Sequence, residues 1–255
     1  MPKAAYFRVE QVHLAIQDIK VLKGISLEIG AGEQLAMIGP SGAGKTSLLR
    51  VLGGGISPTK GEVTLDGHAF HGSKVPNSPS LRQLRSRVGF VHQDHALVPN
   101  LRVIQNVVAG KFGHRGFWSA LRSLLRPQMR DLEEILNLLD RVGIGEKMYH
   151  RVDSLSGGQQ QRAAIARALF QKPEALLADE PVASVDPARA RAVLELLISL
   201  SRERGLTLLV SLHDPALAIE LFPRVIGLRD GRIAFDLPSC QVSDTQLDPL
   251  FQLQE

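Results

Sequence analysis

The segment from Gly39 to Thr46 combines glycines, a lysine and a hydroxyl at a spacing that suits phosphate binding. It fits the pattern G-x-x-x-x-G-K-[ST], in which backbone N–H groups surround the phosphates of a nucleotide. Glycines let the backbone approach an anion closely, Lys45 supplies a positive charge, and the Thr46 hydroxyl is a hard oxygen ligand for Mg²⁺. The residues of this predicted loop are Gly39, Pro40, Ser41, Gly42, Ala43, Gly44, Lys45, Thr46 and Ser47.

A second segment, Leu176–Pro181, places two acids at the end of an apolar run. Its order, Leu-Leu-Ala-Asp-Glu-Pro, is typical of a buried strand that ends at Asp179 and Glu180. Successive side chains of a strand point to opposite faces, so the two carboxylates can serve different purposes. Asp179 suits a Mg²⁺-linked role, whereas Glu180 can reach the water that attacks a γ-phosphate and act as its base.

Both segments need a framework that brings the ends of several strands together. Gln34–Ile38 is an apolar run in front of the loop, and Lys45–Gly53 has helical character after it. Thr207–Leu212 is long enough for a buried parallel strand, and Pro187–Arg204 has helical spacing. Strands that alternate with helices predict a layered α/β core. Further strands are expected at Phe7–Val12, Val21–Ile29, Gly61–Leu65, Val88–Val91, Ala175–Ala178, Val225–Leu228 and Arg232–Phe235.

The remaining segments connect or interrupt this core. The stretch from about Leu101 to Leu169 is expected to be largely helical and to be an insertion into the core. Gly72–Ser80 is rich in Gly, Ser, Pro and Asn, which predicts an exposed loop. Asp230–Gly231 indicates a hairpin turn. The chain beyond Leu237 is expected to be a short polar tail.

Composition limits the classes of protein to be considered. The 255 residues are 44% hydrophobic and 22% charged, which is ordinary for a globular protein. The net charge of +4 is thinly spread, so we expect no nucleic-acid partner. The single cysteine, Cys240, excludes an intrachain disulfide and favours an intracellular protein. The sequence has neither a signal peptide nor an apolar run of ~18 residues, so membrane contact is expected to go through a partner.

Further motifs, in a fixed order, resemble those of ATP-binding-cassette (ABC) ATPases. Leu155–Arg162 reads Leu-Ser-Gly-Gly-Gln-Gln-Gln-Arg, which is similar to the signature of that family. Gln93 resembles the Q-loop glutamine, and His213 resembles the switch histidine that contacts the γ-phosphate. Ser184–Asp186 resembles the D-loop, with Val185 where the family usually has leucine.

This resemblance covers nearly the whole chain, roughly residues 7–236. It implies an α/β fold: a P-loop NTPase core with an antiparallel β subdomain and an inserted α-helical subdomain. It also implies catalytic roles for Glu180, His213 and Gln93, Mg²⁺ contacts for Thr46, Gln93 and Asp179, and a nucleotide contact for Asp186. The expected divisions are an ATPase domain over residues 1–240, its core at about 1–92 and 166–235, its helical subdomain at about 93–165, and a short polar tail at 241–255.

The signature residues Ser156, Gly157, Gly158 and Gln159 also have a physical rationale. The two glycines leave the backbone bare, Ser156 offers a hydroxyl, and a helix that begins there aims its N–H groups at an anion. In the family this helix end faces ATP bound to the opposite subunit. The resemblance therefore implies that two copies of the chain enclose two MgATP, related by a two-fold axis.

One position departs from the pattern of the family. Its members place an aromatic residue, usually tyrosine, where it stacks on adenine, and Ile16 occupies that position here. Stacking of a base on an aromatic side chain contributes about 1–3 kcal/mol, so we expect weaker or less base-selective nucleotide binding. The alternative is that Ile16 packs under the base and supplies part of the same dispersion energy.

Longer strings are similar to the ATPase subunits of phosphonate importers, a subfamily with close relatives for phosphite or hypophosphite. The similarity implies a bacterial importer with a homodimeric membrane permease and a separate periplasmic or extracellular substrate-binding protein. This chain would then lie at the cytoplasmic face of the inner membrane. The strings are Leu101–Val107, Phe117–Ser119, Ala178–Ser184, Val210–His213 and Ile226–Gly231.

Several alternatives remain open at this point. Gly113–Arg126 contains Trp118 and three arginines, which fit a contact with the permease or with lipid head groups, or equally a solvated amphipathic helix. The solute could be another small molecule, such as an amino acid or phosphate. Two functions outside transport are also compatible with the motifs: an ABC ATPase that acts on ribosomes or DNA, and a regulatory partner in cell division.

Overall fold

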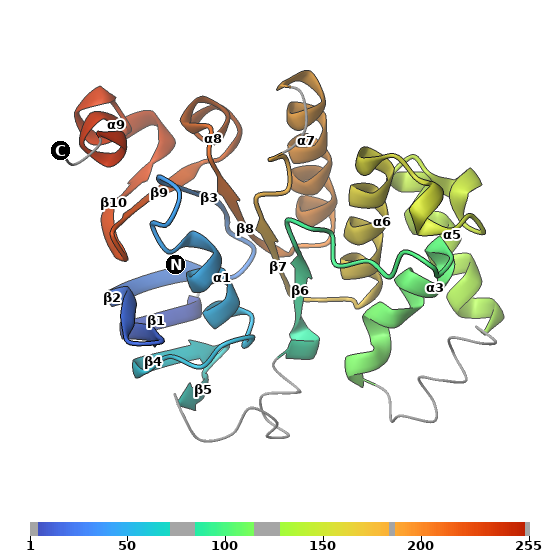
Figure 1. Cartoon of the computed structure of the whole chain (residues 1–255), viewed down its shortest axis with the longest axis horizontal. Coiled ribbons are helices and arrows are strands. Elements are labelled where there is room, and N and C mark those ends of the chain that lie inside the picture. The colour runs from blue at the N-terminus through green and yellow to red at the C-terminus, as the bar shows by residue number, and fades with distance from the viewer. Residues whose placement is uncertain (1–4, 72–84, 115–127, 184–186, 253–255) are drawn as a thin grey trace.

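The computed structural model describes residues 5–71, 85–114, 128–183 and 187–252 (Figure 1). Two sheets form the framework: a four-stranded sheet that contains the first strands, and a six-stranded sheet. None of the helices in the described ranges is long and apolar enough to cross a membrane. The loop expected at Gly72–Ser80 lies outside the described residues.

The four-stranded sheet is antiparallel and has the order β2-β1-β4-β5. Apolar side chains of β1 and β2 are buried against the helix that follows the phosphate loop, and together they form one hydrophobic cluster. Both strands are longer than their apolar patterns predict, because antiparallel pairing continues through register shifts up to the turn between them. The strands are β1 (Ala5–Ile16), β2 (Ile19–Gly30), β4 (Lys60–Leu65) and β5 (His68–His71).

The six-stranded sheet has the order β10-β9-β3-β8-β7-β6. Its strands pair in parallel except for β10, which forms an antiparallel hairpin with β9 at one edge. Every residue of β3, β7 and β8 is buried, as expected for central strands covered on both faces. The strands are β3 (Gln34–Ile38), β6 (Val88–Val91), β7 (Ala175–Asp179), β8 (Thr207–Leu212), β9 (Arg224–Arg229) and β10 (Arg232–Pro238).

The register of the parallel strands aligns their carboxyl ends. Ile38 of β3 pairs with Leu212 of β8, and Asp179 of β7 pairs with Ser211 of β8. The loops that follow β3, β7, β8 and β6 therefore open at one edge of the sheet, which is where ligands bind in open α/β sheets.

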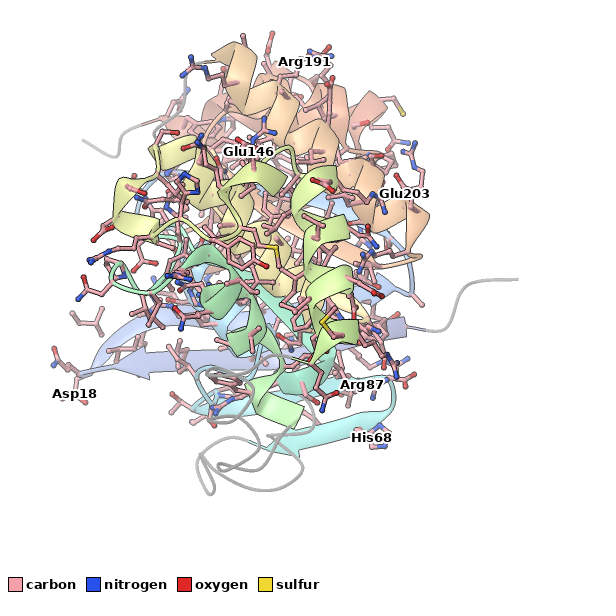
Figure 2. The ribbon with its side chains drawn as sticks, turned by 90° about the vertical axis from the view of Figure 1, so that its right-hand side faces the viewer. Asp18, His68, Arg87, Glu146, Arg191 and Glu203 are labelled. Carbon is pink, nitrogen blue, oxygen red and sulfur yellow. The ribbon has the colours of Figure 1, made fainter. Side chains whose placement is uncertain are left out.

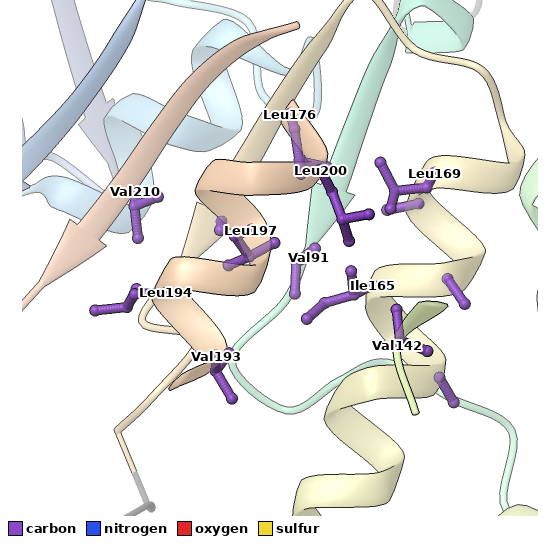
Figure 3. Close-up of a cluster of buried hydrophobic side chains, with 14 of the residues drawn as sticks. Val91, Val142, Ile165, Leu169, Leu176, Val193, Leu194, Leu197, Leu200 and Val210 are labelled. Atoms are coloured by element: carbon purple, nitrogen blue, oxygen red, sulfur yellow. The ribbon is translucent and has the colours of Figure 1, made fainter. Parts of the chain in front are cut away.

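Helices α3, α5 and α6 pack against one another beside β6, and the other helices lie along the strands (Figure 1). In the stretch from about Leu101 to Leu169, which the sequence predicts to be largely helical, the described residues form α3, α5 and α6, with one 3₁₀ turn after α3 and two between α5 and α6. Buried side chains of α6, α7 and the strands, among them Ile165, Leu197 and Leu176, meet in one cluster (Figure 3). The helices are α1 (Lys45–Leu52), α3 (Val103–Val108), α5 (Met129–Arg141), α6 (Gly157–Phe170), α7 (Pro187–Glu203), α8 (Pro215–Leu221) and α9 (Asp244–Phe251).

Arg87, which precedes β6, connects the two sheets. Its Nη2 atom lies 2.6 Å from a carboxylate oxygen of Asp66 in the β4–β5 turn and 2.6 Å from one of Glu174, just before β7. Figure 2 shows Arg87 at the same end of the molecule as His68, the first residue of β5. These hydrogen bonds raise the pKa of the Arg87 guanidinium. Arg87 thereby links the four-stranded sheet to the six-stranded sheet, which contains Asp179.

The C-terminal segment differs from the polar tail that the sequence predicts. Residues Asp244–Phe251 form α9, whose start is capped by Ser243 and Gln246 in a capping box. Leu250 is buried, and Leu247 and Phe251 pack against the same hydrophobic cluster as α6 and α7. These three apolar residues are spaced so that they lie on one face of a helix, although the average composition of the segment is polar.

Replacing Leu250 with alanine tests whether this helix is part of the folded unit. Loss of a buried leucine is expected to lower the free energy of unfolding by about 2–5 kcal/mol. Asp248→Ala, an exposed position of the same helix, serves as control and is expected to change it by no more than about 0.5 kcal/mol. Urea unfolding of both variants measures the difference. Equal stability of the two would mean that α9 is a free tail.

Candidate functional site

The predicted phosphate-binding residues Gly39–Ser47 form the connection from β3 into the first turn of α1. Gly39, Gly42 and Gly44 have φ angles of 154°, 80° and 104°, a region that favours glycine. Gly44 is the N-cap of α1 and offers no capping side chain, so the first N–H groups of the helix are free to bind an anion. This confirms the strand, loop and helix order that the motif requires.

Lys45 is buried at the start of α1 and points back along the loop. Its Nζ donates to the carbonyl oxygens of Gly39 at 2.8 Å and Pro40 at 3.2 Å, and it lies 3.6 Å from Oε1 of Glu180. Burial lowers the pKa of the Lys45 ammonium, and the nearby carboxylates of Glu180 and Asp179 counteract that effect. A desolvated ammonium in this position gains stability from any further negative charge that enters the loop.

Asp179 ends β7 as a buried carboxylate held by two hydroxyls. Thr46 donates from Oγ1 to Oδ1 of Asp179 at 3.1 Å, and Ser211 donates from Oγ to the same oxygen at 2.9 Å. The Thr46 hydroxyl and the Asp179 carboxylate are hard oxygen donors of the kind Mg²⁺ takes, with substrate phosphates and water completing its shell. The donor set therefore fits a phosphate-bound Mg²⁺.

Glu180 has a strained backbone that directs its side chain toward the loop. Its φ is 45°, in the left-handed region that a non-glycine residue rarely adopts, and Ala183 donates its N–H to the Glu180 carbonyl in a tight turn. The Glu180 N–H donates to Oγ of Ser211 at 2.9 Å. Oε1 of Glu180 lies 2.6 Å from Nε2 of His213, at the end of β8. The structure thus brings Lys45, Glu180 and His213 into one contact group.

Ser156 caps the start of α6. Gln159 donates its N–H to the Ser156 hydroxyl at 3.4 Å, and its side-chain oxygen accepts the N–H of Ser156 at 3.0 Å. A Cβ built on Gly157 or Gly158 would meet no atom of the described residues within 4 Å. The predicted signature is therefore an open, bare helix start at the surface.

Ser156, Gly157, Gly158 and Gln159 line a groove of about 740 Å³ together with Gln93 and Glu180. Gln93 is exposed and lies two residues after β6, at the carboxyl edge of the sheet. Among the described residues that line this groove, none belongs to the loop Gly39–Ser47. Glu180, whose carboxylate lies 3.6 Å from Lys45 of the phosphate loop, also lines this groove, so the groove adjoins the contact group of the acids.

Two other predicted positions stand apart from this group. Ile16 is the last residue of β1 and is 43% exposed, paired across the β1–β2 turn with Ile19, which is 69% exposed. It is thus an accessible aliphatic side chain at the tip of a hairpin. The predicted D-loop residue Asp186 lies outside the described residues, as do Ser184 and Val185.

Ser211 is a site residue whose role the sequence patterns did not reveal. It is fully buried in β8, and its hydroxyl binds the Asp179 carboxylate and the Glu180 N–H at the same time. The available signal was a hydroxyl at Ser211, the second one after Thr207, in the otherwise apolar run Thr207–Leu212. Its meaning depends on the register between β7 and β8, which a single sequence does not give.

Gln161 lies within the signature string, but the sequence motif assigns it no role of its own. It is 1% exposed on α6 beneath the signature glycines, and neither atom of its side-chain amide has a hydrogen-bond partner in the described part of the chain. It lines the same groove as Gln93.

Comparisons with known proteins identify the family of the chain. The sequence profile of the family described as ABC transporter matches residues 22–183. A phosphonates import ATP-binding protein, PhnC 2, from Pseudomonas aeruginosa is 46% identical over 95% of this chain and 88% of its own length. The PhnC protein of Pseudomonas fluorescens is 45% identical over 91% of this chain and 86% of its own length.

A solved structure supports the same assignment. An ATP-binding cassette crystallised as a dimer in a post-hydrolysis state with ADP and phosphate has a TM-score of 0.73 and 31% identity, covering 91% of this chain and 98% of that one. The fold, the phosphate loop, the paired acids and the signature helix therefore have one explanation: this chain belongs to the ABC transporter family of ATP-binding proteins.

Proposed function

We propose that this chain is the ATP-hydrolysing subunit of a bacterial ABC importer for phosphonate or phosphite. Two copies enclose two MgATP, each held between the phosphate loop of one copy and the signature helix of the other. The observation that carries the proposal is the contact group of Lys45, Glu180 and His213 beside the buried Asp179, which suits hydrolysis of a γ-phosphate.

The proposed binding step uses groups of both chains. The N–H groups of the loop, the start of α1 and the Lys45 ammonium receive the β- and γ-phosphates. Ser156 and the bare backbone of Gly157 and Gly158 approach the same γ-phosphate from the other copy. Asp186 is proposed to contribute at this interface. Because each chain carries one half of each site, both sites form together when the dimer closes.

The proposed chemical step transfers the γ-phosphoryl group to water. Glu180 accepts a proton as the water oxygen forms its bond to the γ-phosphorus, and the bond from that phosphorus to the bridging oxygen of ADP breaks. His213, which contacts Glu180, is proposed to steady the γ-phosphate, and Gln93, which lines the same groove as Glu180, is proposed to orient the water. Thr46, Asp179 and Gln93 would hold Mg²⁺, which neutralises charge on the phosphate oxygens.

The nucleotide state is proposed to reach a membrane permease through Gln93. The loop that contains Gln93 joins β6, at the edge of the site, to α3 in the helical part of the chain. Closure of the dimer therefore moves the helical part together with an attached permease. We propose a homodimeric permease and a substrate-binding protein outside the membrane, with this chain held at the cytoplasmic face. ATP drives the cycle by binding the closed state more tightly than the open one.

The site described on this chain is proposed to bind a nucleotide, and it carries no information about the transported solute. The solute is therefore proposed from the names of the PhnC relatives. The test is ATPase activity of the complex reconstituted with its permease and binding protein, measured with phosphonate, phosphite, phosphate and amino acids in turn. Stimulation by phosphonate or phosphite alone is the expected result. Stimulation by another solute would keep the mechanism and replace the substrate. Steady hydrolysis that no solute stimulates would favour the functions outside transport.

Glu180→Gln tests the assignment of the catalytic base. The amide keeps the size of the side chain but cannot accept the proton, so kcat is expected to fall by about a hundredfold or more. The affinity for MgATP, measured by calorimetry, should stay close to that of the wild type, whereas Lys45→Ala should lose binding itself. Wild-type turnover by Glu180→Gln would refute the assignment.

Ser211→Ala tests whether one hydroxyl positions both acids. The change removes a donor from Asp179 and leaves the Glu180 N–H without its acceptor, so kcat is expected to fall about tenfold, equivalent to about 1.4 kcal/mol. Ser201→Ala is the matched control, because Ser201 is equally buried and its hydroxyl has no partner among the described residues. Steady-state hydrolysis and urea unfolding of both variants provide the comparison. Equal kcat values in the two would remove Ser211 from the site.

Ile16→Tyr tests the departure from the usual aromatic position. A tyrosine that stacks on adenine should lower the dissociation constant for ATP, since stacking contributes ~1–3 kcal/mol, and raise the preference for ATP over GTP. Ile19→Tyr, across the same turn, is the control for adding an exposed aromatic side chain. Unchanged affinity and unchanged ATP/GTP preference in Ile16→Tyr would show that this position does not meet the base.

A further inference from the structure

The turn between β9 and β10, Asp230–Gly231, makes direct contact with the phosphate loop. Gly231 donates its N–H to the carbonyl oxygen of Ala43 in that loop at 3.0 Å. The Gly231 carbonyl accepts the N–H of Lys23, in β2, at 2.8 Å. One residue of the turn therefore joins the loop to the neighbouring sheet through backbone atoms alone.

Backbone also packs tightly against backbone around this contact. A Cβ added to Gly231 would lie 2.2 Å from the carbonyl oxygen of Val21, and one added to Gly39 would lie 2.1 Å from that of Leu228. A Cβ on Gly44 would lie 3.2 Å from the Val21 carbonyl oxygen. The backbone of the turn therefore lies directly against the backbone of β2, with no space for a side chain at position 231.

The hydrogen bond from Gly231 also orients the part of the loop that binds phosphate. The peptide between Ala43 and Gly44 is planar and trans, so its C=O and N–H groups point in opposite directions. When the Ala43 carbonyl is bound to Gly231, the Gly44 N–H must point away from the turn. That direction leads to the side of the loop where the nucleotide phosphates are proposed to lie.

The turn is held on its other side by the C-terminal helix. Arg229 donates from Nη2 to the carbonyl oxygen of Gln252 at 2.9 Å, and its Nε lies 3.5 Å from the Asp230 carboxylate. Leu250 anchors α9 in the hydrophobic cluster. The turn is therefore fixed between α9 and the phosphate loop.

We infer that Gly231 is a positioning residue for nucleotide binding, because its turn fixes the orientation of the Ala43–Gly44 peptide in the phosphate loop. The inference rests on the proposed function of that loop. Gly231 itself touches neither the nucleotide nor the reacting atoms. A shift of the turn changes how well the loop N–H groups face the phosphates and so changes affinity in the ground state and in the transition state alike.

The β4–β5 turn provides a matched control within the same chain. Asp66 and Gly67 have φ angles of 48° and 74°, and Asp230 and Gly231 have 49° and 75°. No atom of the described residues lies within 4 Å of a Cβ added to Gly67. Alanine therefore introduces the same backbone strain at both turns, but only at Gly231 does it also force the turn away from β2.

The experiment compares Gly231→Ala with Gly67→Ala in the full-length chain. Hydrolysis is measured against MgATP concentration, and MgADP binding is measured by calorimetry. For Gly231→Ala the KM for MgATP and the Kd for MgADP are expected to rise by about tenfold or more, because loop N–H groups that turn away from the phosphates make weaker charge-assisted hydrogen bonds. The kcat at saturating MgATP should stay near that of Gly67→Ala. A residue with a purely structural role would lower thermal stability without this split between KM and kcat.

Equal KM and Kd values in the two variants would overturn the inference, and so would a loss of kcat with KM unchanged. A wild-type chain that fails to bind nucleotide would instead refute the proposed function. If Gly231→Ala does not fold, amide hydrogen exchange of the wild-type chain tests whether the turn is coupled to nucleotide binding. MgADP should slow exchange at the Gly231 N–H and leave Gly67 unaffected, since coupling between binding and the turn is reciprocal. Exchange at Gly231 that ignores bound MgADP would contradict the inference.

Discussion

The concentration of negative charge at the end of β7 is the constraint on which the rest of the site depends. Asp179 and Glu180 each bring a carboxylate to the loop that is proposed to hold a triphosphate, one beside Thr46 and the other beside Lys45. The opposing groups are the Lys45 ammonium, backbone N–H groups and hydroxyls. Burial lowers the pKa of the Lys45 ammonium, and the carboxylates of Glu180 and Asp179 counteract that effect. The phosphates of a bound nucleotide would add further negative charge, which the same ammonium, N–H groups and hydroxyls can bind.

The fold supplies these donors by aligning strand ends. The register of β3, β7 and β8 brings the phosphate loop, the acids and His213 to one edge of the sheet. Ser211 serves both acids because Asp179 is its cross-strand partner in that register. The antiparallel sheet and the β9–β10 turn then hold the loop from the opposite side, through backbone contacts that only glycine permits.

Much of this could be predicted from sequence, and the remainder has identifiable physical reasons. The phosphate loop follows a fixed spacing, and apolar runs such as Thr207–Leu212 indicate buried strands without reference to their neighbours. The role of Ser211 depends on pairing between strands about thirty residues apart in sequence, which periodicity does not contain. The helix α9 was missed because Leu247, Leu250 and Phe251 are a minority in a polar segment, and tertiary packing rather than average composition stabilises it.

The central claim is that one chain carries two half-sites that act only when a second copy completes them. It is supported by the exposed, bare start of the signature helix and by the likeness to an ATP-binding cassette whose structure is dimeric. Sedimentation velocity of the Glu180→Gln chain, with and without saturating MgATP, tests it most directly, because hydrolysis does not then deplete the ligand. The account predicts that MgATP shifts the chain to a species of two copies. A chain that binds MgATP while its sedimentation stays unchanged would contradict the account.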